Sequence, residues 1–184
     1  MGSYKYSNLM QQQVGAAIAL DPNVGALAGN ELHYLAPWHD ADYRHLQTAL
    51  ERLPAGPFDS VILMPFGKLG GADFVAGVLA RAVSQFGPTL ILRTDAADWD
   101  RPDWYPEGVR SVDLSDVFAR IHNKPRALYA LLQCIAAQRI YNVNSRLCFE
   151  TLAVYGERLA LRFRLHAYYF CADHTPEGVE TGYP

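Results

Sequence analysis

Long hydrophobic runs, clusters of basic residues and paired cysteines are all missing from this 184-residue sequence. The longest apolar run near the start, Val14 to Leu20, is too short to cross a bilayer and follows three glutamines, so we expect neither a signal peptide nor a transmembrane segment. Cys134, Cys148 and Cys171 form no C-x-x-C pair, which excludes a disulfide framework and a structural zinc site of that type. We expect buried, reduced thiols in a cytoplasmic protein, with peripheral contact to the inner membrane as its closest association with a bilayer.

Positive charge is scarce as well as dispersed. Lys and Arg total 16 against 19 Asp and Glu, which gives a formal net charge of -3. Without a basic patch nothing attracts a phosphate backbone, so we expect no nucleic-acid partner. Apolar residues make up 50% of the chain, and its length fits one domain of about 150 residues with a short appendage.

The first 58 residues differ in pattern from the rest. Turn-forming residues such as Asp21-Pro22-Asn23 interrupt them, and their clearest helix is predicted from about Asp42 to Leu53. An apolar stripe along that helix is expected to dock on the main body; it consists of Tyr43, Leu46, Leu50 and Leu53. We therefore predict an N-terminal helical appendage over residues 1–58 and a main domain over residues 59–184.

From Ser60 onward, short apolar runs alternate with helical stretches, a pattern typical of a parallel sheet that is covered on both faces. Five strands are predicted: Ser60–Phe66, Thr89–Thr94, Val109–Val112, Ile140–Val143 and Leu165–Cys171. Right-handed crossovers and one reversal of direction give the strand order 3-2-1-4-5. The predicted fold class is therefore α/β, a Rossmann-like three-layer α/β/α domain with a mostly parallel sheet.

Capping residues and apolar spacing predict the helices between these strands. Asn123 is predicted to cap one helix, and Ser145 to cap another that ends near Gly156. Glu157 to Arg164 fits either a short helix or an edge strand. The helix after the first strand is predicted to bury one apolar face, formed by Val75, Val78, Leu79, Ala82 and Phe86.

Ligands of such sheets bind at the carboxyl ends of the strands where the order reverses, which here lies between the first and fourth strands. The loop from Gly67 to Asp73 follows the first strand. Its Gly70 and Gly71 would let a phosphate or diphosphate approach backbone N–H groups at a helix N-terminus. The glycine spacing matches neither a dinucleotide fingerprint nor a P-loop, so a tight turn without a ligand is an equal alternative.

Polar residues follow the fourth and fifth predicted strands. Asn144 and Ser145 offer partners for sugar hydroxyls, with a helix cap as the alternative role for Ser145. Asp173 and His174 follow the fifth strand, and Asp173 is a candidate general base, with a solvated turn as the alternative. The D-x-D pattern at Asp98-Trp99-Asp100 does not directly end an apolar strand, and we predict no metal site and no cofactor.

Three segments in the same order resemble the acceptor-side domain of GT-B glycosyltransferases of family 4. The first is Val61–Phe66 followed by Gly70-Gly71-Ala72-Asp73, which is similar to the family's strand and GGAE-like turn. The second is Ile140–Leu147, and the third is Tyr168–Asp173 with Gly178 and Gly182-Tyr183. Where many members have a histidine at the end of the fourth strand, this chain has Asn144-Ser145, and the family's donor-binding C-terminal domain is absent from this chain.

The resemblance implies transfer of a sugar from a nucleotide-sugar donor to a glycan, in polysaccharide or lipopolysaccharide biosynthesis. Gly70 and Gly71 would then leave room for the donor diphosphate, Asn144 and Ser145 would position the acceptor, and Asp173 would be the base. The expected partners are the nucleotide-sugar, the glycan acceptor and the missing donor-binding domain, and we expect the chain alone to lack transfer activity. Two alternatives stay open: a stand-alone nucleotide-binding oxidoreductase and a non-catalytic interaction module.

Overall fold

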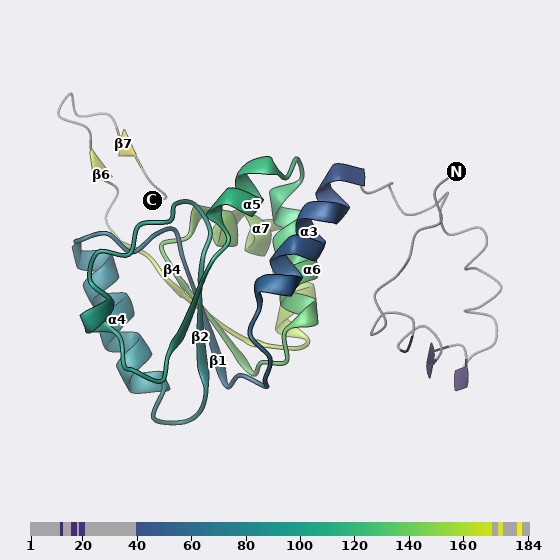
Figure 1. Ribbon diagram of the computed structural model, residues 1–184, viewed down its shortest axis with the longest axis horizontal. Coiled ribbons are helices and arrows are strands. Elements are labelled where there is room, and N and C mark those ends of the chain that lie inside the picture. Colours follow the sequence, from purple (N-terminus) through teal and green to yellow (C-terminus); the bar gives the residue numbers. More distant parts are fainter. Residues whose placement is uncertain are drawn as a thin grey trace. The chain divides into compact units, whose positions relative to one another are not determined.

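The computed structural model describes residues 12, 16, 17, 19, 20, 40–170, 173, 174, 180 and 181. The chain divides into two compact units, Met1–His39 and Asp40–Pro184, and the second contains the sheet (Figure 1). Within the described part, no helix is both long enough and apolar enough to cross a membrane.

The core of the second unit is a five-stranded, all-parallel sheet in the order β3-β2-β1-β4-β5. Its strands are β1 (Ser60–Met64), β2 (Thr89–Arg93), β3 (Arg110–Asp113), β4 (Arg139–Val143) and β5 (Arg164–Tyr168). Every residue of β1 and β2 is buried, because these strands lie inside the sheet and are covered on both faces. The predicted Rossmann-like fold and strand order are confirmed.

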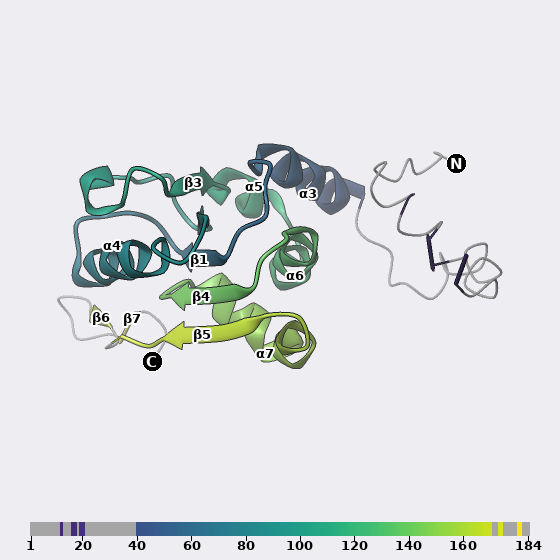
Figure 2. The same cartoon turned by 90° about the horizontal axis from the view of Figure 1, so that it is seen from below.

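Helices cover both faces of this sheet. Helix α4 (Gly71–Val83) lies on one side, and α6 (Lys124–Cys134) and α7 (Arg146–Ala160) pack together on the other (Figure 2). Helix α3 (Asp40–Arg52) contacts α6 and the short α5 (Ser115–Arg120), a helix that the sequence analysis did not predict. The helix predicted for the N-terminal appendage is therefore packed on the body that carries the sheet.

The prediction for the buried face of α4 is wrong. Val78 is 52% exposed and Phe86 is 77% exposed, whereas the buried face consists of Asp73, Ala76, Gly77, Ala80 and Val83. Small residues are buried because this helix approaches its neighbours closely: a Cβ added at Gly77 would lie 3.0 Å from the Cβ of Trp104, in the 3₁₀ turn η2 (Pro102–Trp104). Of the larger apolar residues of α4, Phe74 and Val78 are exposed, whereas Leu79 is partly buried against the core and Val83 is buried.

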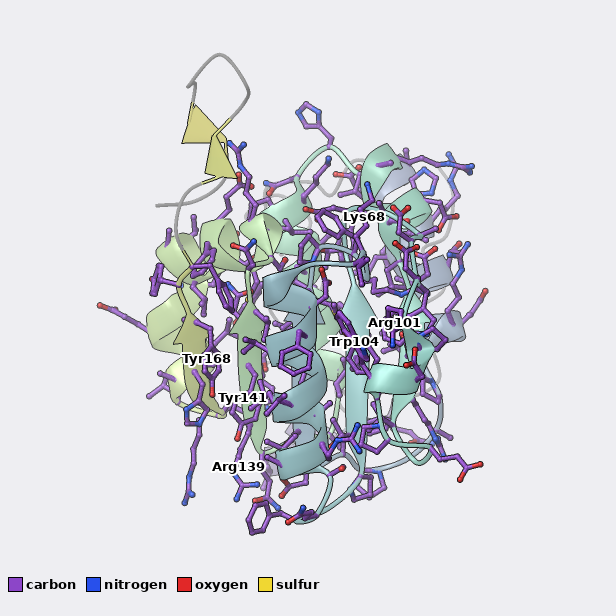
Figure 3. All side chains as sticks on the ribbon, turned by 90° about the vertical axis from the view of Figure 1, so that its left-hand side faces the viewer. Lys68, Arg101, Trp104, Arg139, Tyr141 and Tyr168 are labelled. Carbon is purple, nitrogen blue, oxygen red and sulfur yellow. The ribbon has the colours of Figure 1, made fainter. Side chains whose placement is uncertain are left out.

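The side of the sheet that carries α4 is covered only in part. Figure 3 looks onto this side and shows Trp104 on one flank of α4, with Tyr141 and Tyr168 on the other, over β4 and β5. The Tyr141 ring stacks on His166, with 4.6 Å between the ring centroids, and Tyr168 is 37% exposed. Most of β5 is accordingly exposed, unlike the inner strands.

The helix caps follow the sequence more closely than the helix faces do. Asn123 caps α6 by accepting a hydrogen bond from the Arg126 amide at 3.2 Å, as predicted. Helix α7 does not end near Gly156 but continues to Ala160, and Arg164 then begins β5. The predicted burial of all cysteines is wrong for Cys134, which is exposed, while Cys148 is buried and Cys171 lies outside the described residues.

Candidate functional site

The order of the sheet reverses between β1 and β4, which are hydrogen-bonded neighbours. The chain leaves β1 into α4 on one face and leaves β4 into α7 on the other, so the loops after these two strands meet at the carboxyl edge. This is the switch point predicted from the sequence, and it brings the Gly67–Asp73 loop and the Asn142–Arg146 loop to the same edge of the sheet.

The loop after β1 is held by the loop after β2. The Gly67 amide donates a hydrogen bond to the Asp98 carbonyl at 2.8 Å, and the Leu69 amide donates to Asp100 Oδ2 at 3.3 Å. A Cβ at Gly67 would lie only 2.4 Å from the Trp99 ring, so only glycine allows this approach. Part of the backbone that was predicted to receive a phosphate is therefore already hydrogen-bonded.

Gly70 and Gly71 lie at the start of α4 and remain open to approach. Gly70 precedes the helix in an extended conformation, without a side-chain cap on the first turn. Gly71 is exposed, and no atom lies within 4 Å of a Cβ built on it. A ligand could come close to this backbone, although binding of a donor diphosphate here stays a prediction.

Charge around this turn is mostly negative. Asp73 is buried in the first turn of α4, and burial raises the pKa of its carboxyl group to about 6, with a smaller contribution from Asp100. Lys68 lies 3.7 Å from Asp98 and over the Phe66 ring, so its charge is partly balanced. The turn therefore offers accessible backbone but little positive charge for a diphosphate.

The turn after β4 is closed by its own side chains. Asn142 is fully buried; its Oδ1 accepts a hydrogen bond from the Ser145 amide at 2.9 Å, and its Nδ2 donates to the Ser145 carbonyl at 3.2 Å. Between them, Asn144 has a φ of 61°, the left-handed conformation that asparagine tolerates better than most residues. The fold thus gives Asn142 a structural role and leaves the side chain of Asn144 half-buried at the edge.

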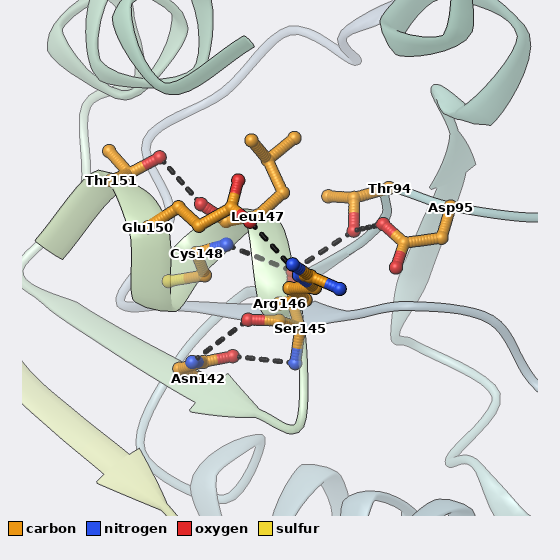
Figure 4. A network of polar contacts seen from close by, with 9 residues as sticks. All are labelled: Thr94, Asp95, Asn142, Ser145, Arg146, Leu147, Cys148, Glu150 and Thr151. Atoms are coloured by element: carbon orange, nitrogen blue, oxygen red, sulfur yellow. Dashed lines mark hydrogen bonds and ion pairs between the residues drawn. The ribbon is translucent and has the colours of Figure 1, made fainter. Parts of the chain in front are cut away.

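Ser145 joins two strands at the carboxyl edge (Figure 4). Its hydroxyl is fully buried, accepts a hydrogen bond from the Cys148 amide at 3.1 Å and lies 3.0 Å from Thr94 Oγ1. Thr94 Oγ1 in turn donates to Asp95 Oδ1 at 2.6 Å. The capping role of Ser145 is confirmed, whereas contact between its hydroxyl and a ligand stays a prediction that would require these bonds to open.

Asp173 does not belong to the five-stranded sheet. It belongs to β6 (Asp173–His174), which pairs antiparallel with β7 (Glu180–Thr181) in a separate two-stranded sheet. Its role as a base stays a prediction.

A cleft of about 340 Å³ lies at the carboxyl edge, at a place that no sequence pattern predicted. We call it the β2–α7 cleft; its lining residues are Thr94, Asp95, Ser115, Phe118, Ala119, Lys124, Arg146, Leu147 and Glu150. Partial burial raises the pKa of the Asp95 carboxyl group above its ordinary value, and the Thr94 hydroxyl and Lys124 oppose that shift. The cleft therefore combines anionic, cationic and hydroxyl groups with apolar walls.

Among the residues that the structure describes, no group of three or more His, Cys, Asp or Glu side chains could hold a metal ion. No known protein family matches the chain, and neither a curated protein nor a solved structure is significantly similar to it. Any assignment of function must therefore come from the residues at the carboxyl edge.

Proposed function

We propose that this chain is the acceptor-side domain of a glycosyltransferase that moves a sugar from a nucleotide-sugar to a glycan. The observation that carries the proposal is the meeting of two turns, one with Gly70 and Gly71 and one with Asn144, at the switch point of a Rossmann-like sheet. Ligands of doubly wound sheets bind at this position. The resemblance of the same segments to family 4 GT-B enzymes supports the choice of ligand.

In the proposed reaction an acceptor hydroxyl attacks the anomeric carbon of the donor. The bond from that carbon to the diphosphate oxygen breaks, and a base, proposed to be Asp173, takes the hydroxyl proton. Asn144 would orient the acceptor, and Gly70 and Gly71 would leave room for the diphosphate. Because the two substrates must be held together, the proposed partner is a donor-binding domain, and the proposed setting is cytoplasmic polysaccharide or lipopolysaccharide synthesis.

A matched pair of glycine substitutions tests this proposal in the natural full-length protein. Gly71→Val should leave folding nearly unchanged, because an added Cβ has open space, but it should weaken donor binding by covering the backbone at the start of α4. Gly108→Val is the control, since a Cβ there also meets no atom within 4 Å. Transfer is measured by mass spectrometry of glycan acceptors incubated with a panel of nucleotide-sugars.

We expect transfer in the natural protein, a raised KM for the donor in Gly71→Val, and no change in Gly108→Val. Absence of transfer with every donor would reject the enzyme proposal. Equal donor KM values in the two variants, with transfer intact, would remove the glycine turn from the donor site.

A further inference from the structure

We propose that the β2–α7 cleft binds a sugar that carries an oxyanion, either a phosphate or a carboxylate. As a statement about the glycan acceptor this rests on the proposed function, but binding itself can be measured without any transfer. The volume of the cleft, about 340 Å³, lies at the lower end of the range for small-molecule sites. The polar groups of the cleft decide the chemistry of the ligand.

Ser115 is the first indication that a ligand belongs here. It is only 8% exposed and lines the cleft, yet its hydroxyl makes no hydrogen bond with any described residue. Among the described residues only Arg93 Nε is a fully buried side-chain atom without a partner, so the Ser115 hydroxyl is open to the cleft. A bound ligand could therefore exchange a hydrogen bond with it.

The cleft has two cationic side chains, Lys124 and Arg146, and two carboxylates, Asp95 and Glu150, but only one cation is held in a close ion pair. Arg146 is paired with Glu150, with 3.0 Å between Nε and Oε1, whereas Lys124 forms no ion pair within the described part of the chain. The amides of Arg146 and Leu147, in the first turn of α7, likewise have no acceptor there. An anion would be stabilised by the lysine and by the positive end of the helix dipole.

The other polar groups of the cleft suit a polyol better than a bare anion. Asp95 accepts one hydrogen bond from Thr94, and its carboxylate retains capacity for donors such as sugar hydroxyls. Phe118 and Leu147 add apolar wall, against which the C–H face of a sugar ring can pack. A neutral sugar would offer Lys124 no negative charge, and inorganic phosphate has no sugar ring to pack against Phe118 and Leu147.

Binding to the full chain is tested by calorimetric titration with four probes. Glucose 6-phosphate and glucuronate present the two oxyanions on one sugar, glucose lacks the anion, and inorganic phosphate lacks the sugar. We expect at least one anionic sugar to bind at least about tenfold more tightly than both glucose and inorganic phosphate. A factor of this size is what one charge-assisted hydrogen bond contributes to the affinity. The anionic sugar that binds more tightly shows whether the cleft prefers a phosphate or a carboxylate.

Two variants locate the site, each with a control elsewhere on the chain. Lys124→Met and Ser115→Ala should each weaken binding of that sugar, by about tenfold for the lysine. Arg158→Met and Ser111→Ala change exposed residues outside the cleft and should leave the affinity unchanged.

Lysine labelling of the unmodified chain gives a readout that does not depend on the folding of variants. The sequence has only three lysines, Lys5, Lys68 and Lys124. The bound sugar should slow acetylation of Lys124, measured by mass spectrometry, and leave Lys68 unchanged. Equal protection of both lysines, no binding of either anionic sugar, or binding of glucose or phosphate as tight as that of the anionic sugars would overturn the proposal, whatever the transfer assay shows.

Discussion

Asn144 is the one described non-glycine residue with a left-handed backbone, and its φ of 61° decides how it should be tested. Alanine is strained in this conformation, whereas glycine adopts it freely. Asn144→Ala should therefore lower the free energy of unfolding by about 1 kcal/mol, and Asn144→Gly should change it much less. Urea denaturation of both variants checks this, and an equal loss in both would show that backbone conformation is not the cause.

The same comparison separates structure from function in the proposed enzyme. Asn144→Gly removes the amide group and keeps the turn, so a loss of transfer in this variant would point to contact with the acceptor rather than to misfolding. The alanine variant alone would mix the two effects.

Asp73 should make stability depend on pH. Its carboxyl group has a pKa of about 6 in the folded chain, raised chiefly by burial, against about 3.9 in an unfolded chain. Between pH 4 and 6 the folded state therefore binds more protons, so stability falls as the pH rises through this window. Asp73→Asn stays neutral and should be more stable than the parent at pH 7 by as much as about 3 kcal/mol, with little difference at pH 4.

Denaturation of both proteins at the two pH values measures this difference. A gap of the same size at pH 4 and pH 7 would show that folding does not raise the pKa of Asp73.

Among the helices, Gly77 in α4 and Gly156 in α7 form a natural pair. A Cβ at Gly77 would lie 3.0 Å from both the Cβ and the carbonyl oxygen of Trp104, whereas the nearest atom to a Cβ at Gly156 is Leu152 Cβ at 4.0 Å. Alanine at Gly156 should stabilise the chain by about 0.5 to 1 kcal/mol, because glycine is a poor helix former. Alanine at Gly77 should destabilise it by about 1 kcal/mol or more, because the packing against η2 must open.

Thermal unfolding of the two variants tests whether close packing, rather than helix propensity, decides at Gly77. Stabilisation by both substitutions would contradict the close contact between α4 and Trp104.

The strands could be predicted from the sequence because burial on both faces leaves a continuous apolar run, as in Val61 to Met64. The face of α4 could not be predicted in the same way. Its apolar residues lie nearly all round the helix, and the buried side is chosen by how closely Ala76 and Ala80 allow it to approach the sheet. The size of the side chains, which the apolar periodicity does not take into account, decides which face of α4 is buried.

The candidate site could likewise be predicted only in part. Topology alone located the turns at Gly70 and Asn144, because a strand order fixes where the carboxyl ends meet. The β2–α7 cleft could not be found this way, since Ser115 and Lys124 come from helices whose relative packing no local pattern encodes, and α5 itself was not predicted.

At the scale of the whole molecule, sequence and structure place the start of the sheet-bearing unit at different residues. The sequence pattern predicts a boundary after residue 58, whereas the structure separates Met1–His39 from Asp40–Pro184. Helix α3 contributes to the second unit through Leu46 and Ala49, which are 7% and 0% exposed.

Two truncations distinguish these boundaries. A chain starting at Asp40 should keep the free energy of unfolding of the full chain to within about 0.5 kcal/mol, because it retains α3, the sheet and all of its covering helices. A chain starting at Asp59 should lose about 3 kcal/mol or more. It exposes the surface that Leu46 and Ala49 cover, and it removes Asp42, whose carboxylate accepts hydrogen bonds from the His122 and Asn123 amides at 2.8 and 3.1 Å. Guanidinium denaturation of the three chains measures the differences, and equal stability of the Asp59 chain would support the boundary after residue 58 and reduce α3 to an appendage.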